Sequence, residues 1–277
     1  MGLPVPAALS PCLTDHLCFA YDDASELPER ARAYLATGTA LGQRAVVLAP
    51  RRELGLGQKI ADAAALRSAA TVDVLEPAGI GGNRTVDAKA TLRFLDAALS
   101  SALDEGFTGL RVVAMLTQLA TEPFLRRGLG SWEHVVGQWQ SCRPVATACC
   151  VDRTVLGDKA VQELACLHPR VITSGPLVPF RLFFRGGQLV LEGEVDSFTA
   201  PLLAHAVRHV RAVPGERLMI DARGLGFVNH RGLTALVDGL ARRTGGVTLL
   251  GAPALVHTLR ESLGVGDDLL DVLPCPW

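Results

Sequence analysis

The stretch Leu110–Leu116 reads LRVVAML, an almost continuous apolar run. Similar runs occur at Ala45–Ala49 (AVVLA) and at Val145–Val151 (VATACCV), and segments with helical spacing of apolar residues separate them. A strand with one face in water alternates in polarity, whereas a continuous apolar strand is buried on both faces. The sequence therefore predicts an α/β domain with a mainly parallel sheet that helices cover on both sides.

The other segments of the first 175 residues fit the same pattern. Short apolar runs predict strands, and apolar residues at helical spacing predict helices. We expect residues 1–14 to form a loose arm ahead of this domain. The further strands expected are Leu17–Tyr21, Thr71–Leu75 and Val171–Thr173, and the helices expected are Leu27–Leu35, Thr85–Leu103, Pro123–Gln140 and Asp158–Leu167.

A turn-rich patch, Thr173-Ser174-Gly175-Pro176, interrupts both periodicities. We expect a boundary here, between a domain over residues 15–175 and a second, smaller α/β domain over residues 178–277. In the second domain, Arg181–Phe184 and Leu189–Leu191 flank Gly186-Gly187, which predicts a β-hairpin. The other elements expected there are helices Thr199–Val210, Arg231–Arg242 and Pro253–Leu263, and strands Arg217–Asp221 and Val247–Leu250.

Composition argues against several classes of function. Lys+Arg 27 against Asp+Glu 28, with 5% aromatic residues, gives no electrostatic or stacking surface for nucleic acid or for an anionic membrane. The 7 cysteines include no CxxC pair, which favours reduced thiols in a cytoplasmic protein. Neither a signal peptide nor an apolar run long enough to span a membrane is present, so we expect neither secretion nor membrane insertion.

The second domain carries an ordered set of motifs. Gly193-Glu194-Val195-Asp196 precedes Thr199-Ala200-Pro201-Leu202, and Met219–Val228 leads into Asn229-His230-Arg231-Gly232-Leu233. This order resembles the STAS domain of the anti-sigma-factor-antagonist type. The resemblance implies a small sheet flanked by helices, with a surface that docks onto a kinase-like anti-sigma factor. The residues that it implies at this surface are Asp196, Asn229, His230, Arg231 and Gly232.

The sequence departs from that family at the residue that acts as its switch. The family carries a serine at a helix N-terminus, where a phosphate is stabilised by the helix amides and spoils the docking surface. His230 stands at this position and Arg231 follows it, so neither can accept a phosphoryl group on a hydroxyl. Permanent docking, control by the other domain and a different partner all remain open. Phosphohistidine or pH sensing at His230 is a fourth interpretation, and an ordinary helix-start residue is the plain alternative.

The first domain carries a second set of motifs. Asp15-His16 opens it, Gly109–Val113 lies near its middle, and Trp132-Glu133 and His168-Pro169 follow. This order resembles the MEDS sensory domain of bacterial and archaeal regulators, which is related to the RecA/KaiC-like ATPase fold. The resemblance implies a sensor that is joined to an output module.

An ATPase of that fold needs a phosphate-binding GxxxxGK[ST] loop. Here Gln58 precedes Lys59, Ile60 replaces the hydroxyl residue, and Met115 stands where an acidic residue is common, so we expect no ATP hydrolysis. A small ligand is still expected at the carboxyl ends of the strands, where open α/β sheets bind. The candidate residues are His16, Tyr21, Arg51, Arg52 and Gln118, each of which is also compatible with an ordinary core or surface role.

Two further groups of residues suggest sites but lack the rest of the pattern. His205 and His209 are four apart on a predicted helix and could bind zinc, but no clear third ligand accompanies them, so we expect a solvated face. Ser131, His134 and Asp152 lack the GxSxG context of a hydrolase serine. We therefore expect no catalytic residue, no metal and no cofactor.

Together these features predict a cytoplasmic regulator, without enzymatic activity, in bacterial stress signalling and transcription control. A degenerate RecA/KaiC-like MEDS domain would control a STAS domain by shifting the population of its exposed docking surface. The expected partner is an anti-sigma factor or another kinase-like regulatory protein, and a homodimer remains open. The alternatives are a nucleotide-binding or weakly hydrolysing enzyme, and an oligomeric scaffold.

Overall fold

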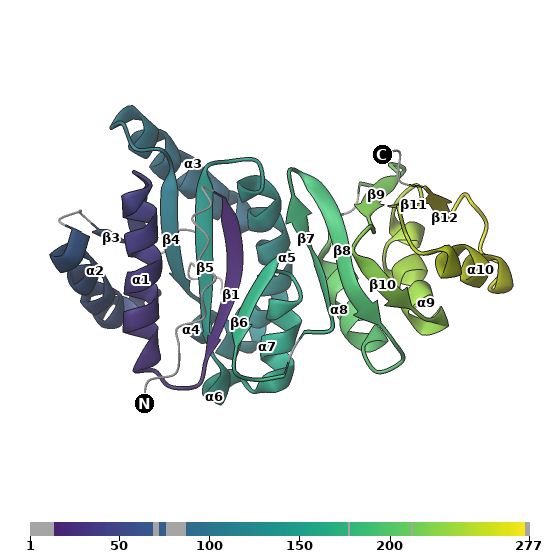
Figure 1. The fold of residues 1–277 in the computed structure, drawn as a ribbon, viewed down its shortest axis with the longest axis horizontal. Coiled ribbons are helices and arrows are strands. Elements are labelled where there is room, and N and C mark those ends of the chain that lie inside the picture. The colour runs from purple at the N-terminus through teal and green to yellow at the C-terminus, as the bar shows by residue number, and fades with distance from the viewer. Residues whose placement is uncertain (1–13, 69–71, 76–86, 177, 212, 275–277) are drawn as a thin grey trace. The chain divides into compact units, whose positions relative to one another are not determined.

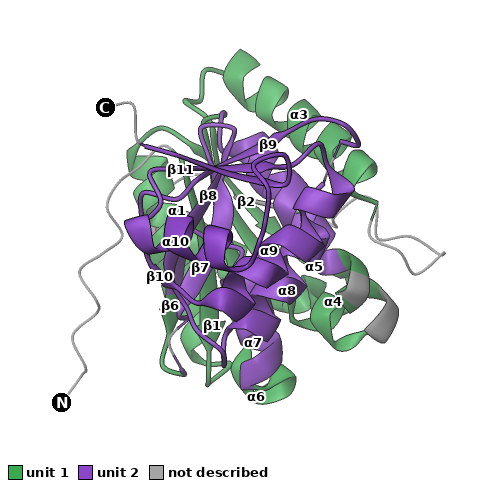
Figure 2. Cartoon of the chain, turned by 90° about the vertical axis from the view of Figure 1, so that its right-hand side faces the viewer, with its two compact units in different colours: residues 1–128, 143–157, 172–175 green, residues 129–142, 158–171, 176–277 purple. Residues whose placement is uncertain are grey.

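The structure is a computed structural model that describes residues 14–68, 72–75, 87–176, 178–211 and 213–274. It contains two six-stranded sheets, each accompanied by helices (Figure 1). Two compact units are distinguished in Figure 2, residues 1–128, 143–157 and 172–175 in the first and residues 129–142, 158–171 and 176–277 in the second. The predicted mixed α/β architecture is confirmed.

The first sheet has the order β3-β2-β4-β5-β1-β6. The pairings β3–β2, β2–β4, β4–β5 and β5–β1 are all parallel, and every residue of β4 is buried. The predicted parallel sheet is therefore confirmed for these strands. Their bounds are β1 (Asp15–Tyr21), β2 (Arg44–Leu48), β3 (Val72–Leu75), β4 (Leu110–Met115), β5 (Val145–Asp152) and β6 (Arg170–Thr173).

Helices alternate with these strands along the chain. Their bounds are α1 (Glu26–Ala40), α2 (Leu54–Ser68), α3 (Ala88–Asp104), α4 (Thr117–Thr121), α5 (Pro123–Gln140), α6 (Arg153–Leu156) and α7 (Asp158–Ala165), and a 3₁₀ turn, η1 (Arg51–Glu53), precedes α2. Apolar side chains of α1 and α2 share a core with one face of β1, β2, β4 and β5. The helix α2 was not among the elements predicted from the sequence.

A buried arginine lies where α1 meets the sheet. Arg111 on β4 is only 2% exposed, its guanidinium carbon lies 4.8 Å from the centre of the Tyr34 ring, and its Nε donates to Gln43 Oε1 at 2.9 Å. A Cβ at Gly38 would come within 2.4 Å of the Arg111 Cβ. A glycine is therefore needed at this point of α1 for the helix to lie this close to β4.

The second sheet has the order β10-β8-β9-β11-β12, and β7 pairs with β8. The β7–β8 pair is antiparallel and turns at Gly186 and Gly187, whose φ angles of 56° and 80° suit a tight hairpin. The predicted hairpin is therefore confirmed. The strands are β7 (Phe180–Arg185), β8 (Gln188–Val195), β9 (Leu218–Asp221), β10 (Leu225–Val228), β11 (Val247–Leu250) and β12 (Leu270–Leu273).

The helices of this region are α8 (Ala200–His209), α9 (His230–Gly239) and α10 (Ala254–Ser262), with a 3₁₀ turn, η2 (Ala241–Arg243), after α9. Leu203, Leu236 and strand residue Leu191 are fully buried in one core. The helix predicted at Arg231–Arg242 is shorter in the structure, where it ends at Gly239 and the 3₁₀ turn η2 follows. Among the described residues, no helix is both long and apolar enough to cross a membrane.

Candidate functional site

His16 on β1 and Cys149 on β5 lie close together on neighbouring strands of the first sheet. Leu17 and Phe19 of β1 and Ala148 of β5 belong to the core beneath α1 and α2. Because side chains alternate along a strand, His16 and Cys149 face the opposite side of the sheet. His16 is 6% exposed, Cys149 is 2% exposed, and the Sγ of Cys149 lies 3.5 Å from Nε2 of His16.

Burial fixes the charge of this histidine. Removal of the His16 ring from water lowers its pKa to about 3, so the imidazole is neutral at physiological pH. A neutral imidazole presents a nitrogen lone pair, and its Nε2 is the atom that approaches the thiol sulfur. The pair therefore offers one nitrogen and one sulfur donor in a water-poor environment.

A second polar pair consists of Glu133 on α5 and His168, which precedes β6. Glu133 is 1% exposed and His168 is 0% exposed, and Glu133 Oε2 lies 3.5 Å from His168 Nε2. The Nδ1 of His168 lies 3.0 Å from the carbonyl oxygen of Leu164, one turn back along the chain. A carbonyl only accepts, so Nδ1 carries a proton, and Nε2 faces the Glu133 carboxylate.

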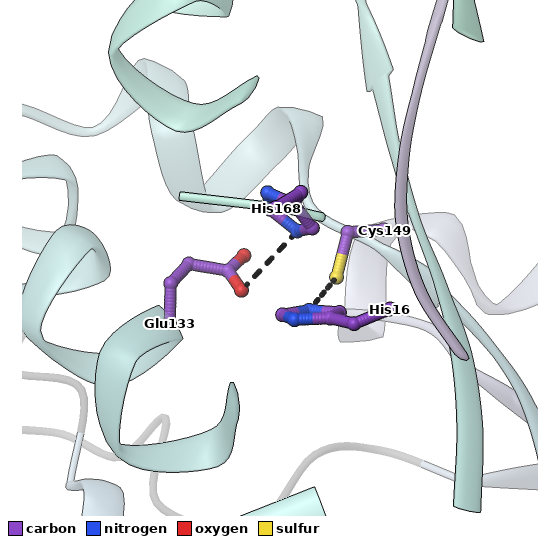
Figure 3. A group of neighbouring side chains, drawn as sticks. All are labelled: His16, Glu133, Cys149 and His168. Atoms are coloured by element: carbon purple, nitrogen blue, oxygen red, sulfur yellow. Dashed lines mark hydrogen bonds and ion pairs between the residues drawn. The ribbon is translucent and has the colours of Figure 1, made fainter. Parts of the chain in front are cut away.

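Figure 3 shows the two pairs, His16 with Cys149 and His168 with Glu133. The sequence analysis listed His16 as a ligand candidate and met Glu133 and His168 only as motif residues. It interpreted Cys149 as an ordinary buried thiol. The sequence signal that could have drawn attention to these residues is a polar side chain inside an otherwise apolar segment.

The other ligand candidates of the first domain lie near the carboxyl ends of β1, β2 and β4. Tyr21 ends β1 and is 5% exposed, and burial raises its pKa to about 12. Arg51 and Arg52 are exposed in η1, and Gln118 is half-buried on α4. Tyr21 belongs to the core beneath α1 and α2, on the opposite face of the sheet from His16. His16 and Tyr21 therefore point to opposite sides of the sheet.

The predicted docking loop in the second domain contains two side chains, Asp196 and Asn229, that accept hydrogen bonds from the backbone. Asp196 Oδ1 accepts from the backbone nitrogens of Phe198 and Thr199 at 2.9 and 2.8 Å, and the Thr199 hydrogen bonds hold the pKa of Asp196 below its usual value. Asn229 is the N-cap of α9, where its Oδ1 accepts from Gly232 N at 3.0 Å. Its Nδ2 donates to Ser197 Oγ at 2.8 Å, which joins the two halves of the loop.

The remaining residues of this loop differ sharply in exposure. His230 and Arg231 are exposed at the start of α9, whereas Gly232 is buried. A Cβ at Gly232 would lie 2.7 Å from Val195 Cγ1 and 2.8 Å from Val228 Cγ2. Beside the loop, a shallow groove between α8 and α9 is lined by Ser197, Ala200, Pro201, Ala204, Arg208, Arg231, Thr234, Ala235, Asp238 and Gly239.

Two groups that the sequence analysis set aside have identifiable partners. His209 Nδ1 lies 3.2 Å from Ser131 Oγ, and its Nε2 lies 3.2 Å from Nε2 of His205. Burial, together with nearby His205 and cationic neighbours, lowers the pKa of His209 to about 4. Asp152 caps α6 by accepting from the backbone nitrogens of Thr154 and Val155. Ser131 and Asp152 thus each have a local hydrogen-bond partner.

Comparison with known proteins gives one match. The model of the MEDS family, the MEthanogen/methylotroph, DcmR Sensory domain, matches residues 15–169. No family model matches the C-terminal part, so the STAS resemblance is not confirmed, and no curated protein or solved structure matches the chain. The matched region contains His16, Glu133, Cys149 and His168 and spans more than half of the sequence. The chain therefore belongs to the MEDS family.

Proposed function

We propose that this protein is a signalling regulator in which the MEDS domain detects a small ligand or ion and the C-terminal domain passes the signal to a protein partner. The observation that carries the proposal is the match of residues 15–169 to a family described as a sensory domain. A sensor needs an output, and the second α/β sheet with its own core is suited to that task.

The proposed docking role rests on the loop segments around Asp196 and Asn229. Its backbone is fixed by the Asn229–Ser197 and Asn229–Gly232 hydrogen bonds, while His230 and Arg231 are exposed above it. A rigid loop with protruding side chains suits protein recognition, because little conformational entropy is lost on binding. From the STAS resemblance we propose an anti-sigma factor or another kinase-like regulatory protein as the partner.

We also propose that the MEDS domain binds without turning its ligand over. Lys59 lies on α2, which begins at Leu54, and it is exposed rather than placed at the mouth of a glycine-rich phosphate loop. A cytoplasmic location fits the cysteines, since none of those in the described ranges forms a disulfide. Regulation would then follow from a shift between two states of the docking loop rather than from a reaction product.

The experiment is affinity capture from host lysate with the wild-type chain and with His230→Asp. The variant places a carboxylate at the exposed N-terminus of α9, where the STAS domains that this region resembles carry their phosphate. The matched control is His257→Asp, since His257 is an exposed histidine on α10, with its side chain 52% exposed, and undergoes the same change of charge. All three chains are compared by far-ultraviolet circular dichroism before capture.

The proposal predicts that wild type and His257→Asp retain a kinase-like anti-sigma factor or related regulator, and that His230→Asp loses most of it. Equal retention by all three chains would remove the docking role from this loop. If no regulatory protein is retained by any chain, the partner class proposed here is wrong, and the MEDS family membership is unaffected.

A further inference from the structure

The second half of α8 holds two histidines that face each other. His205 and His209 have their ring centres 4.7 Å apart and their Nε2 atoms 3.2 Å apart. Both side chains are half-buried, whereas the sequence analysis expected a solvated face. We propose that these two Nε2 atoms bind one Zn²⁺ ion. The inference does not depend on the proposed docking role, because it rests on one helix and the side chains that pack around it.

The distance between the two nitrogens fits this geometry. Zinc–nitrogen bonds of about 2.0–2.1 Å at tetrahedral angles place two nitrogen ligands about 3.3–3.4 Å apart. The observed separation of 3.2 Å therefore requires only a small movement of either ring. Residues four apart lie on the same face of a helix, and pairs of histidines at this spacing bind zinc in metalloproteases. The backbone of α8 thus holds both ligands in place.

His209 is oriented and neutral, as a zinc ligand must be. Its Nδ1 lies 3.2 Å from Oγ of Ser131, so a proton on Nδ1 is donated to the hydroxyl and Nε2 keeps its lone pair. Burial is the main cause that lowers the pKa of His209 to about 4, so the ring is neutral at physiological pH. A neutral ring binds zinc without first losing a proton.

His205 must change its tautomer to bind zinc. The Arg208 guanidinium only donates, and its contact of 3.5 Å with Nδ1 of His205 leaves the proton of this ring on Nε2, which then donates to His209. Zinc takes the place of this proton, which moves to Nδ1, so no net proton is released. The contact with Arg208 is lost, but it is long for a hydrogen bond and contributes little. Arg208 also lines the groove beside the docking loop, so zinc binding would alter the charge presented there.

The charges around His209 act in both directions. Arg208 and Arg243 oppose a cation beside this ring, whereas Glu163 on α7 favours one. Because α7 packs against α8, rotation of the Glu163 side chain would supply a carboxylate oxygen as a third ligand, and water would complete the tetrahedron. Ala206 stands where the HExxH motif of metalloproteases carries its glutamate base, so the site is suited to structural or regulatory zinc rather than to hydrolysis.

The test is zinc titration of the full chain under reducing conditions, in competition with a fluorescent chelator. His205→Gln and His209→Gln each remove one ligand, and His230→Gln and His257→Gln are controls that change exposed histidines elsewhere. The wild type and controls should bind about one zinc ion per chain that either ligand variant binds at least about 100-fold more weakly. Ser131→Ala, which removes only the orienting hydroxyl, should weaken the site by about tenfold. Zinc bound by thiols elsewhere is common to all chains and cancels in the comparison.

Anomalous diffraction at the zinc edge from crystals of the zinc-loaded wild type locates the ion without any substitution. A peak about 2.0–2.1 Å from both Nε2 atoms is expected. The absence of a peak there at saturating zinc would overturn the proposal. Equal zinc binding by the wild type and by His205→Gln, with both chains folded by far-ultraviolet circular dichroism, would also overturn it.

Discussion

Replacement of Asn229 by alanine should loosen the docking loop and the start of α9. The substitution removes the N-cap hydrogen bond from Gly232 N and the hydrogen bond to Ser197 Oγ. Loss of an N-cap costs about 1 kcal/mol, and loss of a part-buried side-chain hydrogen bond costs about 0.5–1.5 kcal/mol. We therefore expect the free energy of unfolding to fall by about 1.5–2.5 kcal/mol.

Asn229→Asp is the informative comparison. Its carboxylate still accepts from Gly232 N and is favoured by the positive end of the helix dipole, and the Ser197 hydroxyl can donate to it. We expect this variant to be about 1 kcal/mol more stable than Asn229→Ala. Thr234→Ala, an exposed change on the same helix, is the control and should stay within about 0.5 kcal/mol of the wild type.

The assay is urea unfolding of the full chain, combined with hydrogen exchange of the segment 230–239 to report on this helix alone. Asn229→Ala should speed exchange in that segment and lower the denaturation midpoint. The reasoning would be refuted if Asn229→Ala were as stable as the wild type, or if Asn229→Asp lost as much stability as Asn229→Ala.

Three further predictions concern other parts of the chain. Gly193→Ala should lower the melting temperature, because Gly193 has a φ of 98° and an added Cβ would lie 2.3 Å from a backbone oxygen. The backbone strain alone costs about 1–3 kcal/mol of folding stability. An unchanged melting temperature would contradict this prediction. Arg111→Met should lower the free energy of unfolding, measured in urea, by about 1–3 kcal/mol, because it leaves the buried Gln43 acceptor without its guanidinium donor. Arg111→Lys is the comparison variant, because it keeps the charge. Burial is the main cause that lowers the pKa of His209 to about 4, so below about pH 6.5 the unfolded chain binds a proton that the folded chain does not, and stability falls as the pH drops towards 4. His209→Gln should reduce this loss, measured as the difference between melting temperatures at the two ends of that range. An unchanged pH dependence in the variant would count against the lowered pKa of His209.

Much of the fold could be predicted from the sequence because its strongest signals are local. The apolar runs that became β4 and β5 are too continuous for half-exposed strands, and Pro123 marks the start of α5 where the structure has it. The helix α2 was missed because Gly55 and Gly57 lie in its first turn, where they weaken the helical signal. The strand β10 was missed because it is short and two of its residues, Gly226 and Phe227, are exposed.

The two candidate sites differ in how far the sequence alone could predict them. Asp196 and Asn229 were singled out through the STAS resemblance. In the structure Asn229 caps α9, and Asp196 accepts hydrogen bonds from the backbone of the turn before α8. The pair of His16 and Cys149 could not be predicted, because the two residues lie far apart in the sequence. Only the parallel pairing of β1 with β5, which places His16 opposite Thr147, brings Cys149 near it on the same face of the sheet. No spacing rule along the chain encodes that proximity.

The close packing of Gly232 against Val195 and Val228 has a consequence for how this surface can diversify. The glycine packs the first turn of α9 against the ends of two strands, so the position of the turn does not depend on the exposed side chains of His230 and Arg231. His230 and Arg231 project from this anchored turn into solvent. Their side chains can therefore be exchanged for others without altering the backbone beneath them. If the surface docks a partner as proposed, a change of partner would require substitutions at two exposed positions rather than a new loop.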